Sequence, residues 1–432
     1  MTNVLLVLAD DMRADLLPYA PFLNGVLRPG GTYFSDMQCN VPVCQAARAG
    51  ILTGQYAHHS ANGIYANKDG NIPDPSNDSL PVWLGPVMAK RGMFGKYLLG
   101  AQSTVQPGWD TWRVMGLSEQ NSWPGGYNVY NGTSSFYPDE PQITYLSGQV
   151  KDFITTAPEP WFCYFAPTNP HVNLTFEQNP LPTTMTKYGH IRWDFVIPSA
   201  AEMASKPSWM QALSVLTFQG RSALRQAIRQ QIREVRDLDD ALSGIYATLQ
   251  TSGRLADTVI LFATDSGVHF GEHNYGSTST SDKNTPYDVS SRVPGIGFGP
   301  GFTSGSTVDT MTTLQDLTAT IAAICGATPT VPLDGIDLRT LLTNPNPNRS
   351  ILYERKRDNK FPDCQGIFTQ TRKLMRYSGT IPTTGQPVAG TDVFEAYDRD
   401  TDPDELVSWG NDGGRIDERN TLEAELDQLL SS

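Results

Sequence analysis

Runs of mostly apolar residues recur along the chain and predict buried strands. The clearest runs cover residues 3–9, 161–166 and 258–264, and less regular runs cover 93–98 and 292–298. Apolar runs without polar alternation are typical of parallel strands that are covered on both faces. These segments therefore predict a sheet at the centre of the molecule.

Other stretches show the three-to-four-residue apolar spacing of amphipathic helices. The strongest pattern covers residues 224–249, and shorter patterns cover 314–324, 417–430 and the helix-like stretch 80–90. A further helix is expected to begin at Cys44. Strands that alternate with helices predict an α/β fold with a mainly parallel central sheet flanked by helices.

The remaining segments predict loops and a division of the chain. Residues 106–141 are rich in Gly, Trp, Tyr, Asn and Ser and predict a long surface loop, and residues 172–218 predict an irregular, cleft-forming insertion. An Asn-Pro repeat at 344–348 is typical of a linker. We therefore expect a catalytic α/β domain over residues 1–346 and a small C-terminal α+β subdomain over residues 347–432.

Composition limits the kinds of partner that the protein is expected to bind and its expected cellular location. The 432 residues carry a net charge of −13 and show no evident basic stripe, which argues against nucleic acid as a partner. No run approaches the ~20 apolar residues of a membrane span. Because the chain starts directly on a core strand without a signal sequence, we expect a cytoplasmic protein, although a secreted or periplasmic one stays open.

Chemically active side chains follow the ends of the predicted strands. Each has an ordinary alternative, such as a solvated turn or a surface lysine, but in an open α/β sheet the carboxyl ends of the strands meet at one crevice, where ligands bind. Adjacent carboxylates repel each other unless a cation lies between them. The set therefore predicts a catalytic metal site, formed by Asp10, Asp11, Lys96, His171, Asp265 and Ser266.

Cys44 lies four residues before Arg48 at the expected helix start. The first turn of a helix and a guanidinium together attract anions. Cys44 is therefore a candidate nucleophile, and the alternative is a buried structural cysteine.

This segment resembles the sulfatase signature, in which Cys-x-Pro-Ser-Arg is followed by a short apolar turn and Thr-Gly. Here the motif is Cys44-Gln45-Ala46-Ala47-Arg48, with Ala46 and Ala47 in place of Pro and Ser, followed by Thr53-Gly54. In that family the cysteine is oxidised to formylglycine. The resemblance implies a formylglycine at Cys44 and, as a partner, a formylglycine-generating enzyme.

The order of the other motifs resembles the same family over most of the chain. Leu98 stands where many relatives have a histidine, and Ser266 replaces a ligand asparagine. Within the family, these motifs most resemble those of N-acetylglucosamine-6-sulfatases and arylsulfatases. The matching segments are Asp10-Asp11, Gly95-Lys96-Tyr97-Leu98, Pro170-His171, Thr264-Asp265-Ser266-Gly267 and Lys283 through Pro294.

The resemblance implies an alkaline-phosphatase-like fold and hydrolysis of an aryl or carbohydrate sulfate ester, that is, a small-molecule or saccharide substrate. Its implied catalytic residues are Cys44, Arg48, Lys96, His171 and Lys283. Its implied ligands of Ca²⁺ or Mg²⁺ are Asp10, Asp11, Cys44, Asp265 and Ser266. His58 and His59 are candidates for the proton transfer that relatives assign to the histidine missing at Leu98.

Two other functions fit the same pattern. One is a phosphonate or phosphate diester hydrolase on the same scaffold. The other is a non-catalytic protein that binds sulfated sugars with an unconverted Cys44.

Overall fold

The centre of the molecule is a parallel trio of strands. The computed structural model describes residues 2–60, 75–98, 103–116, 126–171, 180–194, 196–275, 282–358 and 360–432. Strand β1 (Asn3–Ala9) pairs in parallel with β7 (Trp161–Ala166) on one side and with β8 (Thr258–Thr264) on the other. Every residue of the three strands is buried, as their apolar runs predict.

These strands belong to a large sheet with the order β10-β2-β9-β8-β1-β7-β3-β4-β5-β6, in which β11 also pairs with β2. Strand β9 is antiparallel to both β8 and β2, and β5 and β6 form an antiparallel edge. The predicted α/β fold with a mainly parallel sheet is confirmed. The other strands are β2 (Thr32–Gln38), β3 (Lys90–Gly95), β4 (Thr111–Met115), β5 (Val129–Tyr130), β6 (Ser135–Phe136), β9 (Arg292–Phe298), β10 (Ser306–Val308) and β11 (Thr312–Thr313).

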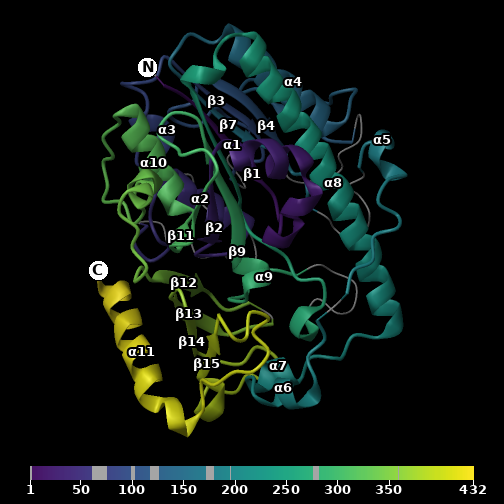
Figure 1. Cartoon of the computed structure of the whole chain (residues 1–432), viewed down its shortest axis with the longest axis vertical. Helices are drawn as coiled ribbons and strands as arrows, with labels where there is room; N and C mark the ends of the chain where they lie inside the picture. The colour runs from purple at the N-terminus through teal and green to yellow at the C-terminus, as the bar shows by residue number, and fades with distance from the viewer. Residues whose placement is uncertain are drawn as a thin grey trace.

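Helices cover both faces of this sheet (Figure 1). Helices α2 (Cys44–Thr53), α3 (Leu80–Trp83) and α10 (Gln315–Cys325) pack on one face. Helices α4 (Gln142–Thr156) and α8 (Phe218–Thr251) pack on the other. Short helical turns complete the layers: η1 (Ala14–Tyr19), η2 (Leu23–Leu27), α1 (Arg28–Gly30), α5 (Pro182–Met185), η3 (Leu255–Asp257), η4 (Glu272–Asn274), α9 (Asp288–Ser291) and η5 (Leu338–Leu342).

A second, antiparallel sheet follows in the order β12-β13-β14-β15. It packs against the C-terminal helix α11 (Ile416–Ser431) and against the short helices α6 (Ala200–Ala204) and α7 (Ser208–Gln211), where Trp209 stacks edge-on against Tyr377. The expected small C-terminal α+β unit is therefore present, while the boundary at residue 346 stays a prediction. The elements are β12 (Ile351–Arg355), β13 (Asp363–Phe368), β14 (Arg372–Ser378), β15 (Phe394–Asp398), η6 (Gly390–Asp392) and η7 (Gly413–Arg415).

Three local expectations were wrong. The strand expected at 93–98 is β3, three residues earlier, because Gly95 turns with φ +116° and its Cα lies against the Ala166 carbonyl. The helix expected over 80–90 stops at Trp83. The described part of the loop expected at 106–141 contains β4, which pairs with β3 and β5 and whose Trp112 and Val114 are buried in the core.

The insertion at 172–218 is less irregular than expected, because α5, α6 and α7 form within it. Residues 172–179 of this segment and 117–125 of the preceding loop lie outside the described residues. Among the described helices, none has the length and the apolar character to cross a bilayer.

Candidate active site

Four neighbouring parallel strands carry the predicted residues to one edge of the large sheet. In the sheet order β8-β1-β7-β3, Asp265 follows β8, Asp10 follows β1, His171 lies beyond β7 and Lys96 follows β3. The side chains of Asp10 and Asp265 are fully buried. The expected gathering at the carboxyl ends of the strands is therefore present.

Backbone contacts hold the two aspartates after β1 in place. Asp11 adopts φ +62°, and its N–H donates to Oδ1 of Asp265 at 3.1 Å. The N–H of Asp10 donates to the Asn169 carbonyl at 3.2 Å, and the Ser266 hydroxyl donates to Oδ1 of Asp11 at 2.7 Å. The loops after β1, β7 and β8 thus share direct hydrogen bonds.

Cys44 is the first residue of α2 and points into this cluster. The preceding Val43 is extended and has no side-chain group that caps the helix. The Cys44 thiol is only 6% exposed, lies 3.2 Å from Oδ1 of Asp10 and contacts Nζ of Lys283. The first turn of α2, with its partial positive charge, is thus directed at the same space as the carboxylates.

Arg48, one turn further along α2, connects residues that follow three of the strands. Its Nε donates to Oδ2 of Asp265 at 2.9 Å, and its Nη1 donates to the Lys96 carbonyl at 2.9 Å. Nη2 lies 3.3 Å from Oδ2 of Asp10. Arg48 is 1% exposed, so it holds two carboxylates and one loop in fixed positions.

Two lysines and a histidine, whose pKa burial lowers, face the same carboxylates from the open side. Nζ of Lys96 contacts Oδ2 of Asp10, and Nζ of Lys283 lies 2.5 Å from Oδ1 of Asp11. Nε2 of His171 lies 3.4 Å from Oδ2 of Asp11. These three side chains are 12–22% exposed, so they are the groups that a ligand from solvent meets first.

The charges and the burial of the cluster shift its pKa values. Burial raises the pKa of the Cys44 thiol well above its usual range, and Asp10 and Asp265 add to the rise. Burial also opposes ionisation of Asp10, but Lys96 and the other cations overcome it and hold that pKa well below the usual range. Burial and the two carboxylates thus favour the protonated form of the unmodified thiol.

The cluster fits a divalent cation. Single ligand atoms from Asp10, Asp11, Cys44 and Asp265 lie within 4.8 Å of one another, and all four residues are buried. Carboxylate and hydroxyl oxygens are the donors that Ca²⁺ and Mg²⁺ prefer, and the Ser266 hydroxyl lies beside Asp11. The donors predicted from the sequence, Ser266 included, are therefore brought together.

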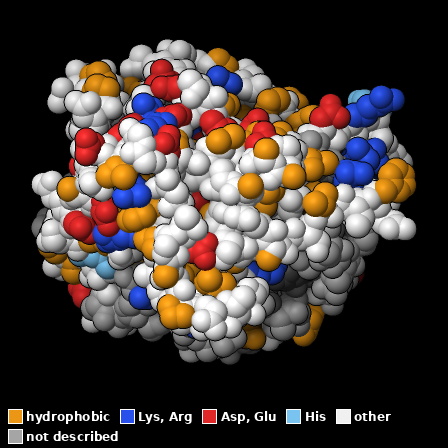
Figure 2. Space-filling model, turned by 90° about the horizontal axis from the view of Figure 1, so that it is seen from below, with side chains coloured by type: hydrophobic (Ala, Val, Ile, Leu, Met, Phe, Trp, Pro, Cys, Tyr) orange, Lys and Arg blue, Asp and Glu red, His pale blue; other side chains and the backbone are white. Residues whose placement is uncertain are grey.

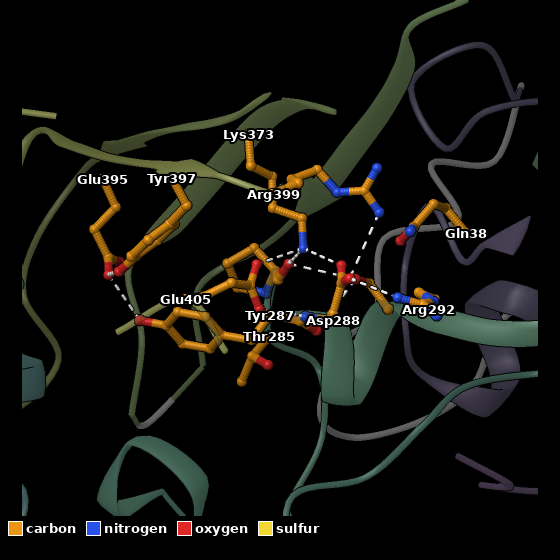
Figure 3. Close-up of polar contacts among 12 residues, drawn as sticks. Gln38, Thr285, Tyr287, Asp288, Arg292, Lys373, Glu395, Tyr397, Arg399 and Glu405 are labelled. Carbon is orange, nitrogen blue, oxygen red and sulfur yellow. Dashed lines mark hydrogen bonds and ion pairs between the residues drawn. The ribbon is translucent and has the colours of Figure 1, made fainter. Parts of the chain in front are cut away.

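The second sheet contacts Tyr287 and Asp288, which follow Lys283 in the chain (Figure 3). Lys373 of β14 donates to the Pro286 carbonyl at 2.9 Å and pairs with Asp288 at 2.5 Å. The Tyr287 hydroxyl donates to Oε1 of Glu395 at 2.7 Å. The C-terminal unit thus contributes to the site by fixing this segment.

We expect Glu405, in this same cluster, to make stability depend on pH. Burial, reinforced by Asp288 and opposed by Lys373, raises the pKa of Glu405 from 4.5 to about 7. The folded protein then binds one more proton than the unfolded chain between pH 4.5 and 7, so its stability falls as pH rises through that window. In urea titrations from pH 5 to pH 7.5, Glu405→Gln should remove up to about 3 kcal/mol of this fall.

The wild type serves as the reference at each pH in that experiment. The Glu405→Gln curve should be the flatter of the two. Parallel curves for the two proteins would show that Glu405 does not titrate in this range.

Two polar residues of α8 support the site and were missed from the sequence. The Gln231 side chain donates to the Asp11 carbonyl at 2.8 Å, and the Asn169 side chain donates to the buried carboxyl group of Glu234. The signal was available, because both residues interrupt the apolar face of the helix. The apolar spacing of 224–249 by itself predicts only packing against the core.

The structure does not bring the two proton-transfer candidates into contact with the cluster. His58 pairs with Glu354 at 3.1 Å, and His59 pairs with Asp334 at 2.9 Å, past the far end of α2. Leu98 is fully buried in the apolar core. A role for His58 or His59 stays a prediction.

Comparison with known proteins relates this chain to sulfatases. The model of the sulfatase family matches residues 2–327. The arylsulfatase of Volvox carteri is 26% identical over an alignment that covers 95% of this chain and 71% of that protein. Human N-acetylglucosamine-6-sulfatase is 24% identical, with 94% of this chain and 80% of that protein covered. The chain spans smaller shares, 31% and 54%, of two other sulfatase relatives.

Solved structures share the whole fold. A structure described as a complex with its substrate D-glucosamine-2-N,6-O-disulfate has a TM-score of 0.80 at 18% identity, covering 100% of this chain and 97% of that one. Phosphonate monoester hydrolase of Agrobacterium radiobacter has a TM-score of 0.75 at 21% identity, covering 100% and 96%. At these identities the likeness establishes the fold.

Proposed function

We propose that this chain, which belongs to the sulfatase family, hydrolyses sulfate esters of sugars with a formylglycine made from Cys44 and a bound divalent cation. Family membership confirms the recognition made from the motifs and the enzyme class, a sulfuric ester hydrolase. The sugar is proposed because the relatives include N-acetylglucosamine-6-sulfatases.

One observation carries the proposal. The buried Cys44 contacts a carboxylate and an ammonium group at a helix start, within a ring of cations. A structural cysteine does not need such surroundings.

A formylglycine at position 44 would supply an aldehyde whose hydrate carries two hydroxyl groups, one to attack sulfur and one to release sulfate. Asp10, Asp11, Asp265 and Ser266 would hold Ca²⁺ or Mg²⁺, whose positive charge would favour ionisation of an oxygen nucleophile at neutral pH.

The chain's own residues bind and orient the sulfate group. The ammonium groups of Lys96 and Lys283 donate to its oxygens from the open side, and the helix start of α2 faces it from below. His171 or Lys283, both beside Asp11, gives the leaving alcohol its proton. Arg48 keeps Asp10 and Asp265 aligned, and its positive charge neutralises part of the negative charge of these carboxylates.

The proposal is tested by peptide mass spectrometry across Cys44, combined with rate measurements. Protein made beside a formylglycine-generating enzyme should show replacement of the CH₂SH group by an aldehyde or its hydrate. It should release sulfate from 6-O-sulfated glucosamine. Unmodified cysteine with no turnover would instead support the sugar-binding alternative.

The phosphonate alternative is favoured by the structural likeness to phosphonate monoester hydrolases. It is separated from the sulfatase by kcat/KM on sulfate, phosphate and phosphonate esters of one alcohol. The sulfatase reading predicts the highest value for the sulfate ester. A higher value for the phosphonate would replace it.

Removal of divalent ions should abolish most activity while the protein stays folded. After EDTA, kcat/KM should fall at least about a hundredfold and return with Ca²⁺ or Mg²⁺. Because Arg48, Lys96 and Lys283 already pair with the carboxylates, the metal-free protein should keep a cooperative unfolding transition.

A second readout of the metal does not depend on turnover. Adding the ion should raise the Tm, and Asp11→Asn should lose that rise. Full activity in excess EDTA, or an equal rise of Tm in Asp11→Asn, would rule out a metal at this cluster.

A further inference from the structure

A stripe of arginines runs along one side of α8. Arg221, Arg225, Arg229 and Arg233 recur every fourth residue, which places them on one helical face over about 18 Å. All four side chains are partly exposed. The expectation that the chain lacks a basic stripe was wrong, because the arginines are separated by three residues each and the net charge of the chain is acidic.

A neighbouring segment adds to the positive charge. Nε of Arg229 donates to the Ile191 carbonyl at 3.2 Å, and Nε of Arg233 donates to the Lys187 carbonyl at 2.9 Å. These bonds hold residues 187–192 along the helix. The side chains of Lys187, His190 and Arg192 on this segment are exposed to solvent.

The charge of this surface is only weakly compensated. Among ion pairs between described residues, none includes Lys187, Arg192, Arg221, Arg229 or Arg233. Arg221, Arg229 and Arg233 instead use backbone carbonyls, which carry no net charge.

Few acids of the described part of the chain lie around this surface. Asp194 is exposed on the same segment. Asp237 is buried, which raises its pKa to about 6, and it interacts with Lys187. By contrast, Arg236 on the same helix pairs with Asp239 and Asp240.

Figure 2 shows Lys and Arg side chains gathered beside a histidine at the right-hand edge of the view, the side on which Figure 1 places α5 and α8. The rest of the visible face carries both signs of charge. A concentrated positive surface on a chain with a net charge of −13 attracts polyanions locally.

We propose that this surface, formed by the arginine stripe and residues 187–192, binds a sulfated polysaccharide beside the active site. The opposite side of the same helix packs against the site through Gln231 and Glu234, so α8 lies between the stripe and the site. A sulfated polymer that extends around the helix can engage both places. A small aryl sulfate can engage only the site.

The choice of a sulfated saccharide rests on the proposed function. Nucleic acid would meet the same cations, but only a sulfated saccharide carries the ester that the proposed active site hydrolyses. Nucleic acid binding is therefore an outcome of the test.

The experiment measures binding of a fluorescein-labelled heparin fragment by anisotropy at several NaCl concentrations. The test variant is Lys187→Gln/Arg192→Gln, which removes two exposed charges and keeps the backbone carbonyls that anchor the segment. The matched control is Arg91→Gln/Arg236→Gln, which removes two arginines that are already ion-paired. A second test variant, Arg221→Gln/Arg225→Gln, probes the stripe itself.

We expect each test variant to raise the Kd for heparin roughly tenfold and to lower the slope of log K against log salt by about one to two. The control should stay within twofold of the wild type, and hydrolysis of a small aryl sulfate should be unchanged in all three variants. An unchanged Kd in both test variants would overturn the proposal. An equal loss of heparin affinity in the control would also overturn it. The same holds if single-stranded DNA of equal charge binds as tightly as heparin through the same residues.

Failure of this surface and failure of the proposed function are distinguishable. Heparin binding is measured without turnover, also on Cys44→Ala. Binding through the stripe without release of sulfate from any ester would contradict the proposed function alone. Release of sulfate without binding at the stripe would contradict this surface alone.

Discussion

Cys44→Ala should lower kcat for sulfate-ester hydrolysis at least about a thousandfold, which is the scale on which removal of a covalent nucleophile acts. The substitution removes the atom that conversion requires and leaves the surrounding cations in place. Binding of the ester should therefore survive better than turnover. The measurement is release of inorganic sulfate, with equilibrium binding of the same ester as the second readout.

Cys44→Ser and Cys39→Ser make this test specific. Serine at position 44 has nearly the shape of cysteine but does not provide the thiol for conversion. Cys39 is a second buried cysteine beside the site, whose thiol donates to the Asp265 carbonyl at 3.0 Å, a bond that a serine hydroxyl can also make.

Cys39→Ser should therefore keep kcat within about threefold, since the bond is kept. A Cys44→Ser enzyme with more than a tenth of the wild-type kcat would contradict the proposed nucleophile. Thermal unfolding of each variant shows whether a loss of activity reflects a loss of folding.

Lys96→Met should reduce kcat/KM by about a hundredfold to a thousandfold, the range observed when one donor to a developing negative charge is removed. Methionine keeps the length and the apolar stem of the side chain but loses the ammonium group that contacts Asp10. Arg48 and His171 still face Asp10, so the buried carboxylate keeps compensation and the protein should fold. Steady-state kinetics on one sulfate ester provide the measurement.

The same strand offers the control. Lys90 begins β3 at the end opposite to Lys96, so Lys90→Met removes an equal charge from the other edge of the sheet. Its kcat/KM should change less than about twofold, because a partly exposed charge at the far end of the strand is screened by salt. Similar losses in both variants would mean that net charge, and not a contact at Lys96, governs the rate.

The central strands were predictable because every residue in them is buried. The runs at 3–9, 161–166 and 258–264 match β1, β7 and β8 in position. Strand β4 was hidden in a segment rich in loop-forming residues. It is stabilised by pairing with β3 and β5, so local composition carries little information about it.

The candidate site was predictable where a residue follows a strand or begins a helix. Asp10, Asp265 and Cys44 are of this kind, since a parallel sheet brings its carboxyl ends together. Glu234 was not predictable in this way, because its role depends on a contact with Asn169, which is 65 residues away. The contacts of the second sheet with the residues after Lys283 also join positions that are far apart in the sequence.

The position of β1 in the sheet also has a consequence for synthesis in the cell. Its two neighbours, β7 and β8, begin at Trp161 and Thr258, so a ribosome adding ~5–20 residues per second needs about 12–50 s between the end of β1 and the start of β8. During that interval a wholly apolar strand has an unpaired edge, which favours aggregation and engagement by chaperones. Slower synthesis or a lower growth temperature should therefore raise the soluble yield. The same interval leaves the Cys44 thiol, 6% exposed in the folded protein, open to a modifying enzyme.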